Sequence, residues 1–170
     1  MKPSVAPVLS RAELPALASR ARAAGQVVGL CNGAFDLFHV GHLRYLHAAA
    51  LECDVLVVAV NSDASVRAAK GPQRPVIPEG ERLELLAAVS GVDAVHLFGE
   101  PTVEAVLRAL RPAIHFKGTD YSVASVPELS VMLELGGEVR IVGDPKDHST
   151  TATAARLANG QGGRKDPPGR

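Results

Sequence analysis

The sequence predicts an α/β fold built around a mostly parallel sheet. Five short runs rich in β-branched and aliphatic residues alternate with stretches whose apolar residues have helical spacing. The runs are largely apolar instead of alternating between apolar and polar positions, which indicates strands covered by helices on both faces. Strands and helices that alternate in this way join through right-handed crossovers, so we expect a Rossmann-like, doubly wound domain.

The first expected helix spans residues 10–24 and precedes all the strands. Ser10 and Glu13 stand at the positions of a capping box, Pro15 restricts the first turns, and Gly25 ends the helix. The strands are expected where β-prone residues lie between turn-forming residues. They comprise residues 27–31, 55–60, 92–98, 113–116 and 138–142.

The remaining helices are expected between and after these strands. The helix after the first strand has an apolar face that includes Leu43 and Leu46. Asp63 is expected to cap the helix after the second strand, and Thr102 the helix before the fourth. Further helices are expected at residues 81–89, 103–110, 128–135 and 151–157.

The composition indicates one soluble domain without net charge. We expect the domain to span residues 1–158 and a Gly- and Pro-rich disordered tail to span 159–170. Lys and Arg balance Asp and Glu at 18 each, which disfavours nucleic acid as a partner. No apolar run reaches membrane-spanning length, so we expect a cytoplasmic protein with no membrane partner. Cys31 and Cys53 lie in or beside strand-like runs and are expected to be free thiols.

Each expected strand runs into a polar segment. In doubly wound sheets, ligands bind beyond the carboxyl ends of the strands, so these segments are the candidate site. They combine glycine, lysine, histidine and hydroxyl residues, which loops selected only for solvation rarely do so repeatedly. The segments are residues 32–36, 61–63, 99–100, 117–121 and 144–151.

The segment after the first strand ends in two histidines separated by a glycine. His39 and His42 stand where a helix begins, and Gly41 removes a side chain that would keep a ligand from the backbone. Free backbone N–H groups, the helix dipole and two imidazoles suit a polyphosphate. Neither the dinucleotide Gly-x-Gly-x-x-Gly pattern nor the Walker pattern occurs, which disfavours nicotinamide chemistry and P-loop hydrolysis.

The run Asn32-Gly33-Ala34-Phe35-Asp36, followed by His39-Val40-Gly41-His42, resembles the cytidylyltransferase-like branch of the nucleotidyltransferase superfamily. The resemblance extends from about residue 27 to 157. Within it, five further features are similar to the heptose 1-phosphate adenylyltransferase group. They are Asn61-Ser62-Asp63, Lys70-Gly71-Pro72-Gln73-Arg74-Pro75, Arg82, Lys117-Gly118-Thr119-Asp120-Tyr121 and Ser149-Thr150-Thr151.

The resemblance implies a reaction and a domain organisation. Enzymes of that group join a sugar 1-phosphate to the AMP of ATP and occur alone or fused to a sugar kinase; this chain would be the stand-alone form. Two positions depart from the group. Thr119 stands where glycine is common, which leaves the sugar open, and Ala34 stands where cysteine is common. Residues 152–155 are also smaller than the aliphatic residues usual there.

The expected chemistry is in-line attack of an acceptor phosphate on the α-phosphorus of ATP. A phosphate monoester has a second pKa of about 6, so the acceptor is mostly a dianion at pH 7 and needs no protein base. The catalytic residues are then His39, His42 and Lys117. The nucleotide-binding residues are Asn32, Gly33, Ala34, Phe35, His39, Gly41, His42, Ser149, Thr150 and Thr151. The substrate-binding residues are Asp36, Asn61, Asp63, Lys70, Arg74, Arg82 and Asp120.

Several of these residues also have a structural interpretation. Phe35 suits packing under the loop better than stacking on adenine, and Asp36 suits a turn as well as a substrate contact. Lys70 and Arg74 could be solvated surface charges, and Ser149 could be an ordinary helix cap.

The expected cofactor is Mg²⁺, carried mainly by the phosphates of ATP, with no metal site built by the protein. The expected partners are the small-molecule substrates, and a homodimer is possible. Two alternatives stay open: a cytidylyltransferase acting on glycerol phosphate or another alcohol phosphate, and a nucleotide-binding module without catalysis.

Overall fold

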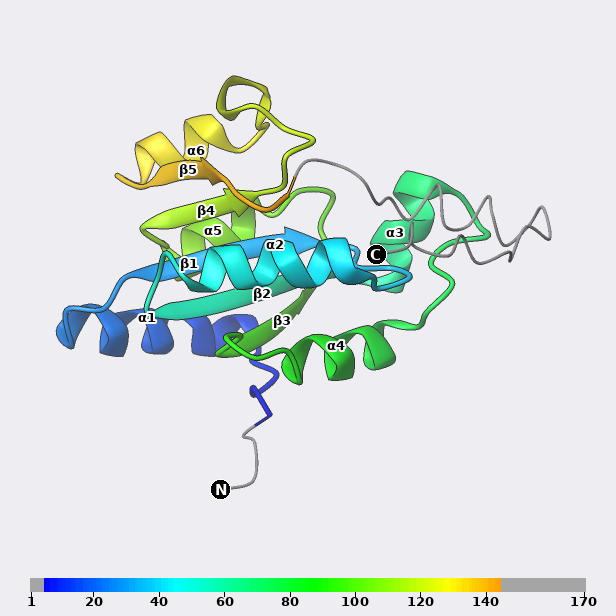
Figure 1. Cartoon of the computed structure of the whole chain (residues 1–170), viewed down its shortest axis with the longest axis horizontal. Helices are drawn as coiled ribbons and strands as arrows, with labels where there is room; N and C mark the ends of the chain where they lie inside the picture. Colours follow the sequence, from blue (N-terminus) through cyan, green and yellow to red (C-terminus); the bar gives the residue numbers. More distant parts are fainter. Residues whose placement is uncertain (1–4, 145–170) are drawn as a thin grey trace, which may run out of the picture.

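The computed structural model describes residues 5–144 as a five-stranded sheet with helices on both faces (Figure 1). All paired strands are parallel, and their order is β3-β2-β1-β4-β5. The strands are β1 (Val28–Gly33), β2 (Val55–Asn61), β3 (Ala94–Phe98), β4 (Ile114–Lys117) and β5 (Glu138–Ile141). The predicted α/β class, the five strands and the parallel sheet are therefore confirmed.

Residues 5–144 also form six α-helices and two 3-10 helices. They are η1 (Arg11–Glu13), α1 (Leu14–Ala23), α2 (Val40–Ala50), α3 (Asp63–Lys70), α4 (Glu79–Ala87), α5 (Glu104–Leu110), η2 (Val123–Ser125) and α6 (Leu129–Glu134). In the described part of the chain, none of these helices is long and apolar enough to cross a membrane.

The two faces of the sheet have separate apolar cores. Leu14 of α1, Leu107 of α5 and Met132 of α6 pack with Val57 on one face. Leu46 of α2 and Leu86 of α4 pack with the neighbouring strand residues Leu56 and Val58 on the other face. Because successive strand residues point to opposite faces, an apolar run such as β2 supplies both cores.

The strand order changes direction between β1 and β4. The chain passes outward from β1 to β2 and β3, then returns and adds β4 and β5 on the other side. The loops after β1 and β4 therefore diverge at their carboxyl ends, where doubly wound sheets bind ligands. Strand β1 continues to Gly33, two residues beyond the prediction, because Asn32 and Gly33 pair with Ala59 and Val60.

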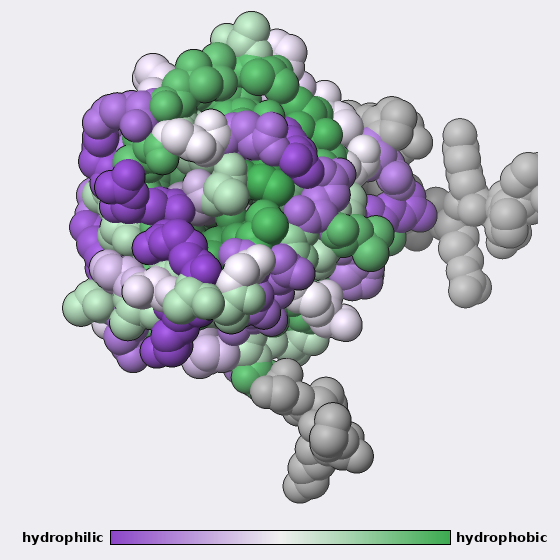
Figure 2. Space-filling model, turned by 90° about the vertical axis from the view of Figure 1, so that its left-hand side faces the viewer, coloured by the Kyte–Doolittle hydropathy of each residue, from purple (hydrophilic) through white to green (hydrophobic). Residues whose placement is uncertain are grey.

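The opposite end of the molecule, where the strands begin, faces the viewer in Figure 2. Hydrophilic and hydrophobic residues are intermixed there, and a depression of about 430 Å³ is lined in part by Glu52, Glu138 and Arg140. The guanidinium of Arg140 forms ion pairs with both carboxylates, at 2.7 Å for Glu52. These three charged groups are paired with one another at the end away from the candidate site.

Two predicted helix caps are wrong. Ser62, not Asp63, caps α3: the Ser62 hydroxyl accepts the Ser65 amide at 3.2 Å, and Asp63 instead pairs with Arg82. Helix α5 starts at Glu104, and no described side chain, including that of Thr102, accepts its first amides. The predicted helix at 151–157 and the tail at 159–170 lie outside the described residues.

Candidate active site

The two histidines of the His-Val-Gly-His segment form the start of α2. His39 has extended backbone angles, and its Nδ1 accepts the Gly41 amide at 3.1 Å. The Nδ1 of His42 accepts the His39 amide at 3.4 Å. Since Nδ1 is the acceptor in each neutral ring, the proton of each ring lies on Nε2. The rings stack with centroids 4.0 Å apart, so two N–H donors are held side by side.

The surroundings of His42 keep its ring neutral. Burial, together with the nearby His39 and Lys70, lowers the pKa of His42 to about 4. The rings of Phe35 and Phe38 lie 5.5 Å from the His42 ring on centroid distances. Phe35 is buried, which favours packing under the loop over stacking on a base.

A second group of polar residues lies where β1 and β4 separate. The Oδ1 of Asn32 accepts the Lys117 ammonium at 3.0 Å and the Nε2 of His115 at 3.0 Å. Because an ammonium only donates, the Asn32 atom is its carbonyl oxygen, and His115 must carry its proton on Nε2. Burial and the charge of Lys117 lower the pKa of His115 to about 3, so this ring is neutral too.

His115 and Glu128 are polar residues of this group that sequence reasoning missed. Glu128 Oε2 forms an ion pair with Lys117 Nζ at 3.1 Å, and both residues are buried. The signal for His115 was its spacing: it precedes Lys117 by two positions on one strand, so the two share a face. Glu128 gave no local signal, because the path of the loop after β4 alone brings it back to Lys117.

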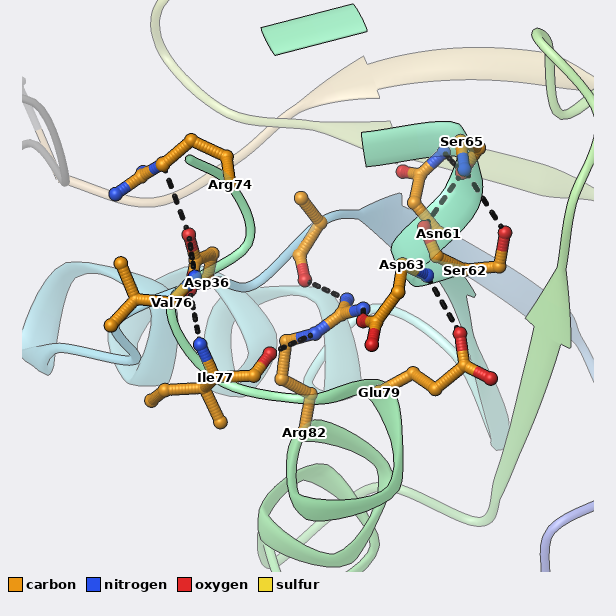
Figure 3. A network of polar contacts seen from close by, with 11 residues as sticks. Asp36, Asn61, Ser62, Asp63, Ser65, Arg74, Val76, Ile77, Glu79 and Arg82 are labelled. Carbon is orange, nitrogen blue, oxygen red and sulfur yellow. Dashed lines mark hydrogen bonds and ion pairs between the residues drawn. The ribbon is translucent and has the colours of Figure 1, made fainter. Parts of the chain in front are cut away.

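The loop between α3 and α4 is held down by Asp36 (Figure 3). The buried Asp36 carboxylate accepts the amides of Val76 and Ile77, each at 3.0 Å, and forms an ion pair with Arg74 Nε at 3.1 Å. These contacts fit the interpretation in which Asp36 orients a loop. Direct contact of Asp36 or Arg74 with substrate stays a prediction.

Arg82 lies at the centre of the same network (Figure 3). Its fully buried guanidinium donates to the carbonyls of Ala34 and Ile77 and to the Asp63 carboxylate, at 3.0 Å for Ile77 and 2.8 Å for Asp63. It thus joins the loop after β1, the loop before α4 and the start of α3. Asn61 donates to the Ser65 hydroxyl at 3.4 Å. Substrate contact by Asn61, Asp63 or Arg82 stays a prediction, and their described contacts order the loops.

The other predicted residues are placed as follows. Lys70 is the exposed last residue of α3 and lies near enough to His42 to influence its pKa. Asp120 lies in the exposed loop after β4. In that loop, the Thr119 hydroxyl donates to the Asp144 carbonyl at 2.7 Å, which joins the loops after β4 and β5. Ser149, Thr150 and Thr151 lie outside the described residues.

A Rossmann-like sheet with paired histidines at the start of α2 and a lysine across the switch point defines a nucleotidyltransferase. Its neutral imidazoles and its ammonium are donors suited to phosphate oxygens. The chain belongs to the cytidylyltransferase-like family, whose model matches residues 30–156.

Individual relatives agree with this membership. The chain is 46% identical over 136 residues to the bifunctional protein HldE of Mesorhizobium japonicum, a match that covers 80% of this chain and 27% of that protein. It is 46% identical over 145 residues to the bifunctional protein HldE of Streptomyces coelicolor, covering 85% and 31% respectively. The chain therefore spans less than a third of the length of these two relatives.

A solved structure has the same fold. The lipopolysaccharide core biosynthesis protein from Thermoplasma volcanium matches with a TM-score of 0.58 and 30% sequence identity. The match covers 69% of this chain and 95% of that one.

Proposed function

We propose that this chain transfers the AMP moiety of ATP to a sugar 1-phosphate, with heptose 1-phosphate as the preferred acceptor, and releases pyrophosphate. An acceptor phosphate oxygen forms a bond to the α-phosphorus of ATP, and the bond from that phosphorus to the bridging oxygen of the β-phosphate breaks. The product is an ADP-sugar. No proton has to be removed from the acceptor, because its phosphate is mostly a dianion at pH 7.

The observation that carries the proposal is the pair of neutral imidazoles with Nε2–H donors beside the start of α2. Such donors stabilise charge that grows on the α-phosphoryl group and on the departing pyrophosphate. They are fixed before substrate binds, since each ring is held through its Nδ1 and the two rings stack. Lys117 supplies a positive charge from across the switch point.

The choice of a sugar phosphate rests on the sequence motifs and on the relatives. The Lys-Gly-Pro-x-Arg-Pro and Lys-Gly-x-Asp-Tyr segments resemble the heptose 1-phosphate group, and the relatives named HldE are 46% identical to this chain. Arg74 lies beside the buried Asp36, which holds its loop near the site. We propose that Lys70 and Arg74 receive the acceptor phosphate.

Mg²⁺ fits this site as a companion of the substrate. Among residues 5–144, no group of three or more His, Cys, Asp or Glu side chains is arranged to hold a metal ion. The triphosphate would carry the ion, which would supply further neutralisation of phosphate charge when bound. The contacts described for the candidate site join residues of this chain and do not depend on the ion.

A cytidylyltransferase acting on an alcohol phosphate is the second candidate, and the family's description as cytidylyltransferase-like favours CTP as its nucleotide. A pyrophosphate-release assay separates the two. ATP, CTP, GTP and UTP are each tested with heptose 1-phosphate and with glycerol 3-phosphate. We expect turnover with ATP and heptose 1-phosphate. Turnover with CTP and glycerol 3-phosphate alone would replace the first proposal by the second, and no turnover with any pair would favour a binding module.

A further inference from the structure

Glu128, the residue that precedes α6, faces Lys117. Lys117 Nζ lies 3.1 Å from Glu128 Oε2, and the side-chain exposures are 8% and 9%. The loop that runs from Gly118 through η2 places this carboxylate beside the end of β4. A glutamate is rarely buried to this extent unless it is paired, and its partner here is the lysine of the candidate site.

The ammonium of Lys117 is only partly used by the protein. It has three N–H donors. One reaches Asn32 Oδ1 at 3.0 Å, whereas Glu128 Oε2 lies 3.1 Å from Nζ in an ion pair without hydrogen-bond geometry. The Tyr121 ring lies with its centroid 5.3 Å from Nζ. Among the residues that the structure describes, Asn32 and Glu128 hold the ammonium from two sides, and the ammonium keeps donors for a phosphate oxygen.

A buried ion pair contributes little net stability compared with an apolar pair of the same volume. Its two charges do depend on each other, because removing one partner leaves the other buried without a counter-charge. The burial of Glu128 is therefore better explained by its effect on the position of the Lys117 ammonium than by a contribution to stability.

We propose that Glu128 is a positioning residue for Lys117: its carboxylate holds the charged ammonium at the switch point between β1 and β4, aimed at the departing pyrophosphate. This inference rests on the proposed nucleotidyl transfer. It adds a residue outside the family motifs quoted above, and it gives the buried carboxylate a function.

The test compares Glu128→Gln with the parent chain. Glutamine keeps the size and an acceptor oxygen but removes the negative charge, so the buried ammonium lacks its counter-charge and moves toward water. We expect kcat to fall about 10-fold or more, while KM for ATP changes less than about threefold, because the contact strengthens as charge develops on the leaving group. Glu128→Asp, which keeps the charge, should recover part of the lost kcat.

The decisive comparison is made in a chain that lacks the lysine charge. If Glu128 acts through Lys117, adding Glu128→Gln to Lys117→Met lowers kcat no further. A further loss in the double variant overturns the positioning role. This comparison also serves if Glu128→Gln alone does not fold, because the double variant leaves no unpaired buried charge. Glu134→Gln is the matched control: it breaks an exposed ion pair of α6, at 2.8 Å from Arg108, and should leave kcat unchanged.

Calorimetry with inorganic pyrophosphate keeps this inference separate from the proposed function. We expect Glu128→Gln to weaken pyrophosphate binding at least about fivefold, and to do so only when Lys117 is present. A parent chain without turnover overturns the proposed function, and the pyrophosphate affinity then decides the role of Glu128. Where the parent chain turns over, an unchanged kcat in Glu128→Gln overturns the role while the proposed function stands.

Discussion

The imidazole of His42 makes the clearest contribution of any single side chain to the proposed chemistry. Its Nδ1 is used by the His39 amide, so its Nε2–H is the group that faces a ligand. We expect His42→Ala to bind ATP within a few-fold of the parent chain and to lose about 10²- to 10³-fold in kcat, the scale for removing one donor that stabilises developing charge. Calorimetry and pyrophosphate release measure the two effects. The exposed His47 provides the control, because His47→Ala should keep kcat, and a His42→Ala chain with the parent kcat would refute the assigned role.

The buried histidines also make stability depend on pH. The pKa is lowered to about 4 for His42 and to about 3 for His115, from an ordinary value of about 6.5. Below pH 6.5 the unfolded chain therefore binds protons that the folded chain does not bind. Stability is fully present above pH 6.5 and falls as the pH drops toward 4, by up to about 1.4 kcal/mol per pH unit for each histidine.

Urea unfolding between pH 4.5 and 8 measures this slope. His115→Gln keeps a donor for Asn32 but cannot titrate, so the slope below pH 6.5 should become about half as steep. The exposed His47 again gives the control, since His47→Gln should leave the slope unchanged. A His115→Gln chain with the parent slope would contradict the assignment of His115 as a buried neutral ring.

At the scale of an element, the start of helix α3 is stabilised by the side chain of Ser62. The Ser62 hydroxyl accepts the Ser65 amide at 3.2 Å, so Ser62→Ala should cost about 1 kcal/mol of unfolding free energy. Thr102→Ala is the matched control, because Thr102 precedes α5 without capping it in the described structure. Its expected cost is close to zero. Equal costs in thermal or urea unfolding would show that the assigned caps are wrong.

The loop between α3 and α4 links an element to substrate selection. In Asp36→Asn the amide oxygen still accepts the backbone amides of Val76 and Ile77, but the ion pair with Arg74 is lost. We expect KM for the acceptor phosphate to rise about 5- to 20-fold, because Arg74, which we propose binds that phosphate, is no longer held in place by Asp36. KM for ATP should change much less, because Arg74 has no proposed contact with ATP. Steady-state kinetics with each substrate varied in turn measures the difference. Glu52→Gln, which breaks an exposed pair with Arg140 at the opposite end of the sheet, should change neither constant, and an equal rise of both constants in Asp36→Asn would argue against this division.

The elements were more predictable than their ends. Runs such as residues 55–60 are apolar over their whole length, so the local sequence alone predicts that they are buried strands. The end of β1 was missed because Asn32 and Gly33 lack β-prone side chains and are held only by their partners on β2. The cap of α3 was misassigned because Ser62 and Asp63 are both good capping residues, and the distant Arg82 decided between them.

The site as a whole was predictable only where sequence order and topology coincide. Strand exits gather at one edge of any doubly wound sheet, so the strand pattern predicts that His42 and Lys117 lie at the same edge. The pairing of Lys117 with Glu128 did not, because it depends on the path of an irregular loop and on no periodic pattern. Arg82 was predicted to bind substrate; in the described structure three of its donors bind other residues of the chain, and substrate contact stays a prediction.

The arrangement of the whole sheet predicts which backbone amides a bound anion protects from hydrogen exchange. A pyrophosphate held by the histidines and by Lys117 would connect the β1 side of the switch point to the β4 side, whereas the charges at the opposite end of the sheet are already paired (Figures 1 and 2). A ligand at 100 times its Kd stabilises the folded chain by about 2.7 kcal/mol. We therefore expect pyrophosphate to slow amide hydrogen exchange both at residues 39–42 and at residues 115–118. Residues 52–54 and 136–138, at the start of the strands, exchange through local fraying and should change little. Protection confined to residues 39–42 would mean that the anion contacts one side of the sheet only, and Lys117 would then have no part in holding it.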